Sequence, residues 1–309
     1  MKKALLLLFV GLFFVGFSQK EEKQTDLEKF NLKGKVKSVI WTKYMVVEKF
    51  GKFRKRTFIK KTISNYNEKG NKIEYARYVS DGSLSYIDIS NYDDNGNKTE
   101  EATYKSDGSL DDKYIYKYDD NGNLTEKVYH NLDDSLNRKC IYKYDDNGNK
   151  IEFKEYGSDG ALNYKQIYKY DNKENLIEEA YYSPGSSFHN TKYIYEYDDN
   201  GNKTEKAKYK SDGSLNYKYT YKYDNKENLI EEAYYSSGSS FHNTKCIYEY
   251  DDNGNKIESK DYGSDGSLRY KRIYKYDEKG NWTKCVYFSI EREITELYQI
   301  TKRKIEYYD

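Results

Sequence analysis

The chain has few proline, histidine, cysteine and methionine residues: its 309 residues include one Pro, three His, three Cys and two Met. So few histidines and cysteines leave little material for a metal site or for a nucleophile with its base. Lys and Arg number 53 and Asp and Glu number 52, so there is no net positive field for nucleic acid and no acidic tail. We therefore expect no cofactor, no nucleic-acid partner and no enzymatic activity.

Long apolar runs are absent beyond the N-terminus. Two lysines precede an apolar run from Ala4 to Phe17. This order is typical of a secretory signal peptide, residues 1–18, and the run is shorter than the roughly 20 residues that span a bilayer. We expect an exported protein, either periplasmic, on the cell surface or secreted, with no transmembrane segment after cleavage. Residues 19–32 are expected to form a polar linker.

Tyrosine is the residue that the chain has in abundance. There are 39 Tyr, and aromatic residues make up 17% of the chain although charged residues reach 34% and the mean hydropathy is −1.12. Disordered chains are poor in aromatic residues. We therefore expect a folded chain in which tyrosine supplies most of the core.

A repeat of 26 or 27 residues organises residues 66–288. Each of nine units opens with a tyrosine followed by Asp or Asn. These opening tyrosines are Tyr66, Tyr92, Tyr118, Tyr144, Tyr170, Tyr197, Tyr223, Tyr250 and Tyr276. The two-unit block 170–222 recurs almost unchanged as 223–275. Such copying suits a modular array better than a single active site.

Each unit is predicted to form two antiparallel strands. Tyr alternates with Lys or Ile before each opening tyrosine, a period of two that indicates a strand. Asp-Asn-Gly and Ser-Asp-Gly turn signals separate these strands, as in Asp120-Asn121-Gly122 and Ser106-Asp107-Gly108. The fold class is therefore all-β, an antiparallel meander of about 18 strands in nine repeats.

We expect this ribbon to coil into a β-repeat solenoid or spiral sheet, because open twisted sheets rarely exceed about ten strands. Contacts between neighbours alone would require caps at both ends. Residues 33–65 are the candidate N-terminal capping strands, and residues 289–309 are the candidate C-terminal cap strand.

Turn type decides which side chains share a face. Two-residue type I′ loops would send the tyrosines of successive strands to opposite faces. Three-residue loops, each a type I turn closed by Gly in the left-handed conformation, would keep positions of like parity together. We favour the second because it gathers one apolar face: Tyr114, Tyr116, Tyr118, Ala102, Tyr104 and Leu110. The other face would keep Lys, Glu and a column of Ile.

The segment Tyr116 to Glu126, Tyr-Lys-Tyr-Asp-Asp-Asn-Gly-Asn-Leu-Thr-Glu, resembles the YD repeats of the RHS family, which also occur in teneurins and toxin cocoons. The resemblance covers residues 66 to about 284 and implies a β-ribbon wound into a spiral or shell on an exported protein, often linked with carbohydrate or partner binding. The chain has Gly-Asn where the family commonly has Gly-Arg. We expect neither the RHS core segment nor a toxin domain, and no functional residue of the family is carried over.

The candidate ligand surface is the row of tyrosines two residues before the opening tyrosines. Its members are Tyr116, Tyr142, Tyr168, Tyr195, Tyr221, Tyr248 and Tyr274. Aligned aromatic rings can stack on sugar rings. The alternative is that these rings pack the core and that only their hydroxyls reach water.

Two carboxylate patterns allow both a chemical and a structural interpretation. Asp-Asn-Gly turns look like calcium loops, but no Glu follows Gly96 at the EF-hand spacing, so turn chemistry explains them. The repeated Glu126, Glu152, Glu178 and Glu231 could supply the carboxylate pair of a glycosidase. Their recurrence predicts cross-strand pairing with lysine instead.

The three cysteines are an odd set. Cys140 and Cys246 stand where other repeats have Tyr193 or Tyr219, so we expect free thiols that replace tyrosine. A disulfide or an intermolecular bridge is the alternative.

The sequence thus predicts an exported, non-enzymatic repeat protein whose surface binds an envelope glycan or a protein partner. A purely structural or spacer role in the envelope is the first alternative. A carbohydrate-active enzyme is the second.

Overall fold

The computed structural model describes residues 24–49, 52–131, 135–185, 189–238, 243–291 and 294–309; the predicted signal peptide lies outside them. They form one short helix, α1 (Asp26–Lys29), and 20 strands that pair as an antiparallel meander in chain order. The strands are β1 (Val36–Lys49), β2 (Lys52–Tyr66), β3 (Lys72–Tyr78), β4 (Leu84–Tyr92), β5 (Lys98–Lys105), β6 (Leu110–Tyr118), β7 (Leu124–His130), β8 (Leu136–Tyr144), β9 (Lys150–Gly157), β10 (Leu162–Tyr170), β11 (Leu176–Tyr182), β12 (Thr191–Tyr197), β13 (Lys203–Lys210), β14 (Leu215–Tyr223), β15 (Leu229–Ser236), β16 (Thr244–Tyr250), β17 (Lys256–Gly263), β18 (Leu268–Tyr276), β19 (Trp282–Glu291) and β20 (Ile294–Tyr307).

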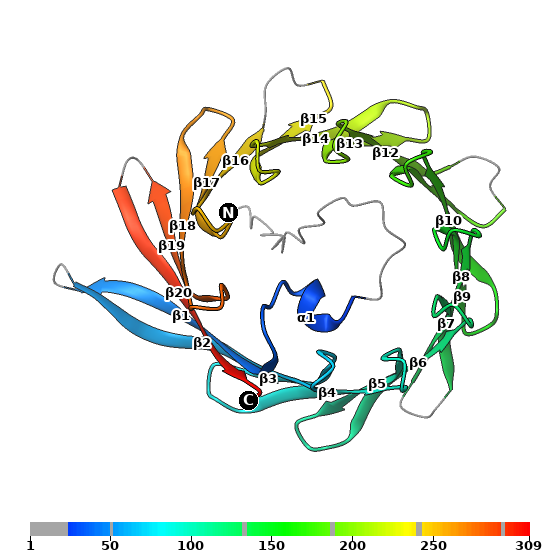
Figure 1. Cartoon of the computed structure of the whole chain (residues 1–309), viewed down its shortest axis with the longest axis horizontal. Helices are drawn as coiled ribbons and strands as arrows, with labels where there is room; N and C mark the ends of the chain where they lie inside the picture. Colours follow the sequence, from blue (N-terminus) through cyan, green and yellow to red (C-terminus); the bar gives the residue numbers. More distant parts are fainter. Residues whose placement is uncertain (1–23, 50–51, 132–134, 186–188, 239–242, 292–293) are drawn as a thin grey trace.

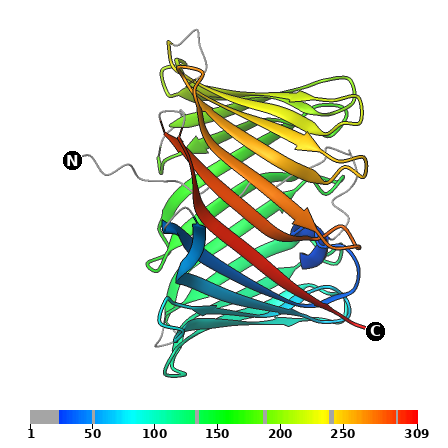
Figure 2. The same ribbon diagram turned by 90° about the vertical axis from the view of Figure 1, so that its left-hand side faces the viewer.

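The meander closes into a β-barrel, so the predicted open solenoid or spiral is wrong. Strand β1 pairs with β2 on one side and with β20 on the other, from Val36 opposite Tyr307 to Met45 opposite Gln299. Figure 1 shows the resulting ring, and Figure 2 shows its steeply tilted strands. The segments expected to cap two separate ends pair with each other instead. Closure removes the unpaired strand edges that an open ribbon would expose.

The turns have the predicted three-residue form. In the turn that follows Tyr118, the N–H of Gly122 donates to the carbonyl of Asp119 at 3.0 Å, and the N–H of Asp119 donates to the carbonyl of Asn123 at 3.0 Å. Gly122 has φ of 81°, the left-handed conformation that glycine adopts without strain. We call the nine turns that follow the opening tyrosines the opening turns. They all lie at one end of the barrel because every second connection of a meander does.

An extra, unpaired residue in the strand beside some turns changes which side chains share a face, so the predicted faces need correction. Thr103 stands opposite Asp112 but Tyr104 stands opposite Leu110, so one residue of β6 is unpaired. Such a bulge reverses the side of every later residue in the strand. Ala102, Tyr104 and Leu110 therefore lie on the face opposite to Tyr114, Tyr116 and Tyr118, and the prediction that all six share one face is wrong.

Helix α1 identifies the inner face of the barrel, because it lies within the ring (Figure 1). Its Asp26 carboxylate accepts hydrogen bonds from the Tyr92 hydroxyl and from the Lys72 N–H, each at 2.8 Å. Leu27 packs in a buried cluster with Val39 and Tyr66. The segment expected to be a polar linker thus contributes apolar side chains to the inside.

Directly opposed residues of antiparallel strands share a face, so the register carries this assignment around the ring. The rows of Tyr116 and Tyr118 and their equivalents point inward. The columns of Glu126, Lys139 and Ile141 and their equivalents point outward, together with tyrosines such as Tyr209.

The outer face is an ion-paired ladder. Each repeated Glu pairs with a lysine of a neighbouring strand: Glu126 accepts from Lys117 at 2.8 Å and Lys139 at 2.5 Å, and Glu178 lies 2.8 Å from Lys169. Partial burial raises the pKa of Glu126, but hydrogen bonds from the two lysines outweigh burial and hold the pKa below its usual value. The predicted cross-strand pairing of these carboxylates is confirmed.

The hydroxyls of the opening tyrosines form hydrogen bonds, which we call staples, that link each repeat to the one before it. From Tyr92 onward, each of the eight hydroxyls donates to the backbone carbonyl of the residue that starts a neighbouring strand 20 or 21 positions earlier. The bonds are Tyr92 to Lys72, Tyr118 to Lys98, Tyr144 to Leu124, Tyr170 to Lys150, Tyr197 to Leu176, Tyr223 to Lys203, Tyr250 to Leu229 and Tyr276 to Lys256, at 2.7–3.0 Å. Tyr308 closes the series with a hydroxyl bond to the carbonyl of Tyr66.

Substituting one staple tests this contact. Tyr223→Phe removes only the hydroxyl that donates to Lys203 at 3.0 Å. The free energy of unfolding should fall by about 0.5–1.5 kcal/mol, the net value of one hydrogen bond, as measured by urea denaturation. The control is Tyr209→Phe on the outer face, since that hydroxyl bonds none of the described residues. Equal stability of the two variants would contradict the staple.

Two opening turns carry glutamate at the left-handed position, Glu174 with φ of 64° and Glu227 with φ of 63°. A side chain in this conformation is strained. Glu227→Gly should therefore stabilise the protein by about 0.5–1 kcal/mol in thermal or chemical denaturation. Gly122→Ala, the reverse change in an equivalent turn, should destabilise it. A loss of stability in Glu227→Gly would refute this account of the turn.

Candidate functional site

The seven tyrosines predicted as a ligand surface all lie on the inner face, near the rim formed by the opening turns. They run around the barrel as one row beside the opening tyrosines. Tyr168 and Tyr195 are buried, at 7% and 8% exposure, and the other five are half-buried. Only part of each half-buried tyrosine ring is therefore accessible from the interior of the barrel.

Inward carboxylates receive several of the row's hydroxyls. Tyr195 donates to Glu179 at 2.8 Å, and Tyr248 donates to Glu232 at 3.1 Å. Neither acid is among the residues predicted from the sequence as a site. The signal was the Glu-Glu doublet, such as Glu178-Glu179, in which alternation sends the first residue outward and the second inward.

Three lysines of β13 extend the row into a mixed aromatic and cationic surface. Lys206 stands opposite Tyr195 and Tyr219, and Lys208 stands opposite Tyr193 and Tyr217. Lys203 lies at the rim, where its Nζ is 5.1 Å from the ring centroid of Tyr221. We call this surface the Tyr–Lys patch, made of Tyr193, Tyr195, Lys203, Lys206, Lys208, Tyr217, Tyr219 and Tyr221.

The lysines of the patch lie against aromatic rings instead of carboxylates. Nζ of Lys206 is 4.8 Å from the Tyr193 centroid, and Nζ of Lys208 is 5.4 Å from the same centroid. Among the described residues, none of the three lysines forms an ion pair. Burial, followed by the charge of a neighbouring lysine, lowers the pKa of Lys203. Burial is also the main cause that lowers the pKa of Lys206.

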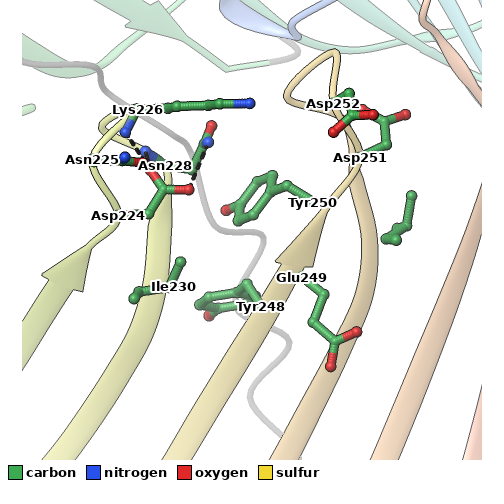
Figure 3. A pocket seen from close by; sticks show the side chains of 11 residues that line it. Asp224, Asn225, Lys226, Asn228, Ile230, Tyr248, Glu249, Tyr250, Asp251 and Asp252 are labelled. Carbon is green, nitrogen blue, oxygen red and sulfur yellow. Dashed lines mark hydrogen bonds between the residues drawn. The ribbon is translucent and has the colours of Figure 1, made fainter.

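A shallow depression of about 400 Å³ lies at the rim beside the patch. Figure 3 shows Tyr248 and Tyr250 pointing from β16 toward the ribbon that carries Asp224 and Ile230. The Asp224 carboxylate is occupied by its own turn, since it accepts from the N–H of Asn228 at 2.8 Å and of Lys226 at 2.9 Å. This use in the turn confirms the explanation of these aspartates by turn chemistry.

The remaining candidates, metal-binding groups and cysteines, form no site among the described residues. Within the described ranges, no group of three or more His, Cys, Asp or Glu is arranged to hold a metal ion. All three cysteines are free thiols, and Cys140 and Cys246 take tyrosine positions on the inner face, as predicted. Burial raises the pKa of the Cys285 thiol to about 11. These thiols therefore serve as packing groups.

Phenol groups of the inner face are held in the protonated form. Burial is the main cause that raises the pKa of Tyr75, Tyr118, Tyr219 and Tyr223 to about 12. Nearby carboxylates and other phenols add to the effect for Tyr219. At neutral pH these hydroxyls are donors.

The raised phenol pKa values predict alkaline unfolding. Because the folded state holds these protons more tightly than the unfolded chain, whose phenols titrate near pH 10, this contribution to stability is complete below pH 10 and is lost as pH rises toward 12. Tyrosinate absorbance of the native protein should rise well after that of the protein in urea, together with loss of the circular dichroism of the sheet. Superimposable titrations of the native and urea-unfolded protein would refute this assignment.

No helix in the part of the chain that the structure describes has the length and apolar character needed to cross a membrane.

No protein-family model and no curated protein matches the chain. The solved structures that resemble it include TcdB2-TccC3-TEV, with 13% identity and a TM-score of 0.34 over 80% of this chain and 16% of that chain. They also include a porin-like protein from Bacteroides uniformis, with 11% identity and a TM-score of 0.37 over 88% of this chain and 98% of that chain. The chain thus spans about one sixth of the first neighbour. Likenesses this distant assign no family.

Proposed function

We propose that this chain is an exported, non-enzymatic binding protein that holds an envelope oligosaccharide on its inner face. The observation that carries the proposal is the continuous inner row of half-buried tyrosines that begins at an open rim of turns. The apolar run from Ala4 to Phe17 behind two lysines supports export.

The chemistry of the row suits sugars. Ring faces of tyrosine stack on the apolar faces of pyranose rings, and hydroxyl, carboxylate and ammonium groups beside them can hydrogen-bond sugar hydroxyls. The inner face supplies all of these within one patch, as at Tyr193, Glu179 and Lys206. The outer face offers lysines already paired with glutamates.

The repeat supports kinship with YD-repeat proteins, through the Tyr-Asp-x-x-Gly-Asn motif that recurs in residues 66 to about 284. That kinship adds weight to carbohydrate or partner binding as the role. The barrel gives such repeats an inside surface in place of the groove of a spiral.

The arrangement of carboxylates argues against a glycosidase. The repeated outer glutamates Glu126, Glu152 and Glu178 are paired with lysines, which favours their ionised form, so none of these three is an acid suited to protonating a leaving group. Inner glutamates such as Glu179 and Glu232 accept tyrosine hydroxyls.

A structural role without ligand is the competing proposal. The burial of Tyr168 and Tyr195 favours it, because a buried ring packs the wall and contacts little else. The two roles differ in whether the half-buried tyrosines bind anything.

A glycan-array screen of residues 19–309 tests the proposal. The inner variant Tyr193→Leu/Tyr217→Leu keeps apolar volume but removes the aromatic rings. The outer variant Tyr209→Leu/Tyr235→Leu is its matched control, and circular dichroism checks the fold of both. We expect saturable binding by the wild type, at least about tenfold weaker in the inner variant and unchanged in the outer one.

Absence of any bound glycan would overturn the proposal in favour of the structural role. So would binding that survives in the inner variant. If the inner double variant is unfolded, Tyr217→Leu alone replaces it in the same comparison.

A further inference from the structure

We propose that the ligand is an anionic oligosaccharide, bearing carboxylate or sulfate groups, and that the Tyr–Lys patch is its site. This inference rests on the proposed function and specifies the class of ligand. It is carried by three inward lysines on one strand that have aromatic neighbours but no counter-ion among the described residues.

The geometry concentrates positive charge on one strip of the wall. Lys206 and Lys208 are two positions apart on β13, so both point inward with Cα atoms about 7 Å apart. The bulge beside the opening turn brings Lys203 to the same face at the rim, where its Nζ lies 5.8 Å from the Tyr195 ring. The strip therefore runs from the rim into the barrel.

The acids that face this strip are engaged elsewhere. Glu179, on the β11 side, accepts hydroxyls from Tyr195 at 2.8 Å and Tyr181 at 3.2 Å. Glu232, on β15 beyond β14, accepts the Tyr248 hydroxyl. Neither carboxylate lies within ion-pair distance of a patch lysine. At longer range the charge of Glu232 raises the pKa of Lys203 and the charge of Glu179 raises the pKa of Lys206, but burial outweighs both, so the wall compensates the ammonium charges only in part.

Three like charges side by side repel one another, and burial adds a desolvation cost. Cation–π contacts with Tyr193, Tyr195 and Tyr221 offset part of this cost. A bound anion would supply the missing counter-charge. The aromatic rings between the lysines would at the same time accept the sugar rings that carry these anions.

The duplicated block shows that two of the three lysines, Lys206 and Lys208, are specific to one copy. Residues 223–275 repeat residues 170–222 almost unchanged, yet they have Ser259 and Asp261 at the places of Lys206 and Lys208. In that copy Asp261 pairs with Arg272 at 2.9 Å, so its charge is compensated. The same backbone therefore folds without two of the three lysines. The third, Lys203, keeps a lysine counterpart in Lys256, and Arg272 stands at the place of Tyr219.

A second inward lysine site lies elsewhere on the wall, where a lysine again contacts tyrosine rings. Nζ of Lys127 lies 4.1 Å from the Tyr114 centroid and 5.2 Å from the Tyr116 centroid, with no ion pair among the described residues. A longer anionic chain could contact this point as well.

The test measures binding by calorimetry at about 0.05 M and 0.15 M salt, where screening lengths differ. The probes are oligogalacturonides and sulfated dextran oligomers, beside neutral galactose and dextran oligomers of equal length. The protein variants are Lys206→Ser/Lys208→Asp, which installs the residues of the sister copy, and Lys203→Gln. The matched control is Lys117→Gln/Lys169→Gln/Lys222→Gln, three exposed outer lysines.

We expect an anionic oligomer to bind wild type and the outer control alike, to bind the inner variants at least about tenfold more weakly, and to lose affinity at the higher salt. Preference for the galacturonides or the sulfated oligomers identifies the acid group. Neutral oligomers bound as tightly as anionic ones, with no effect of the inner variants, would overturn the anionic assignment and leave glycan binding intact. Binding of no oligomer, charged or neutral, would overturn both.

Discussion

The hydrogen bond from each opening tyrosine after the first to the backbone of the preceding repeat is the contact on which the barrel depends. Ladder pairing between β5 and β6 ends at Glu100 opposite Ile115, and the strands continue beyond it toward the rim. The Tyr118 hydroxyl spans this gap and satisfies the carbonyl of Lys98. Phenylalanine would fill the same space without the donor. This accounts for tyrosine in the eight openings from Tyr92 onward, while the residues around them vary.

Local features of this fold were accessible to sequence reasoning because they repeat. The strands, the three-residue turns with left-handed Gly122 and the outward pairing of Glu126 with lysines follow from alternation, turn chemistry and charge order. Two features were not accessible. A single extra residue such as Asp111 in β6 reverses a face without changing the composition pattern. Closure depends on two terminal strands that share no repeat with the rest and pair across nearly the whole chain.

Only part of the proposed binding surface could be predicted from the sequence, for the same reason. The tyrosine row stood out as a column in the repeat, and the structure brings its members to one face. The lysines of β13 did not stand out, because lysine is abundant and the sequence does not say which lysines have a glutamate opposite. Lys139 faces Glu126 across the outer ladder, whereas Lys206 faces two tyrosines. The register alone separates a neutralised lysine from an uncompensated one.

The seam between β1 and β20 gives the molecule an unusual folding problem. Most strand partners are joined by a short turn, so the ribbon can form by local zippering. Val36 and Tyr307, in contrast, must meet across the length of the ribbon. The entropy of closing a chain segment grows with its length, and distant contacts slow folding. The pairings between β1 and β20 are therefore expected to form last and to close the barrel. Until it closes, two bare edges are open to strands of other molecules, so the period of greatest vulnerability to misassembly falls at the end of folding.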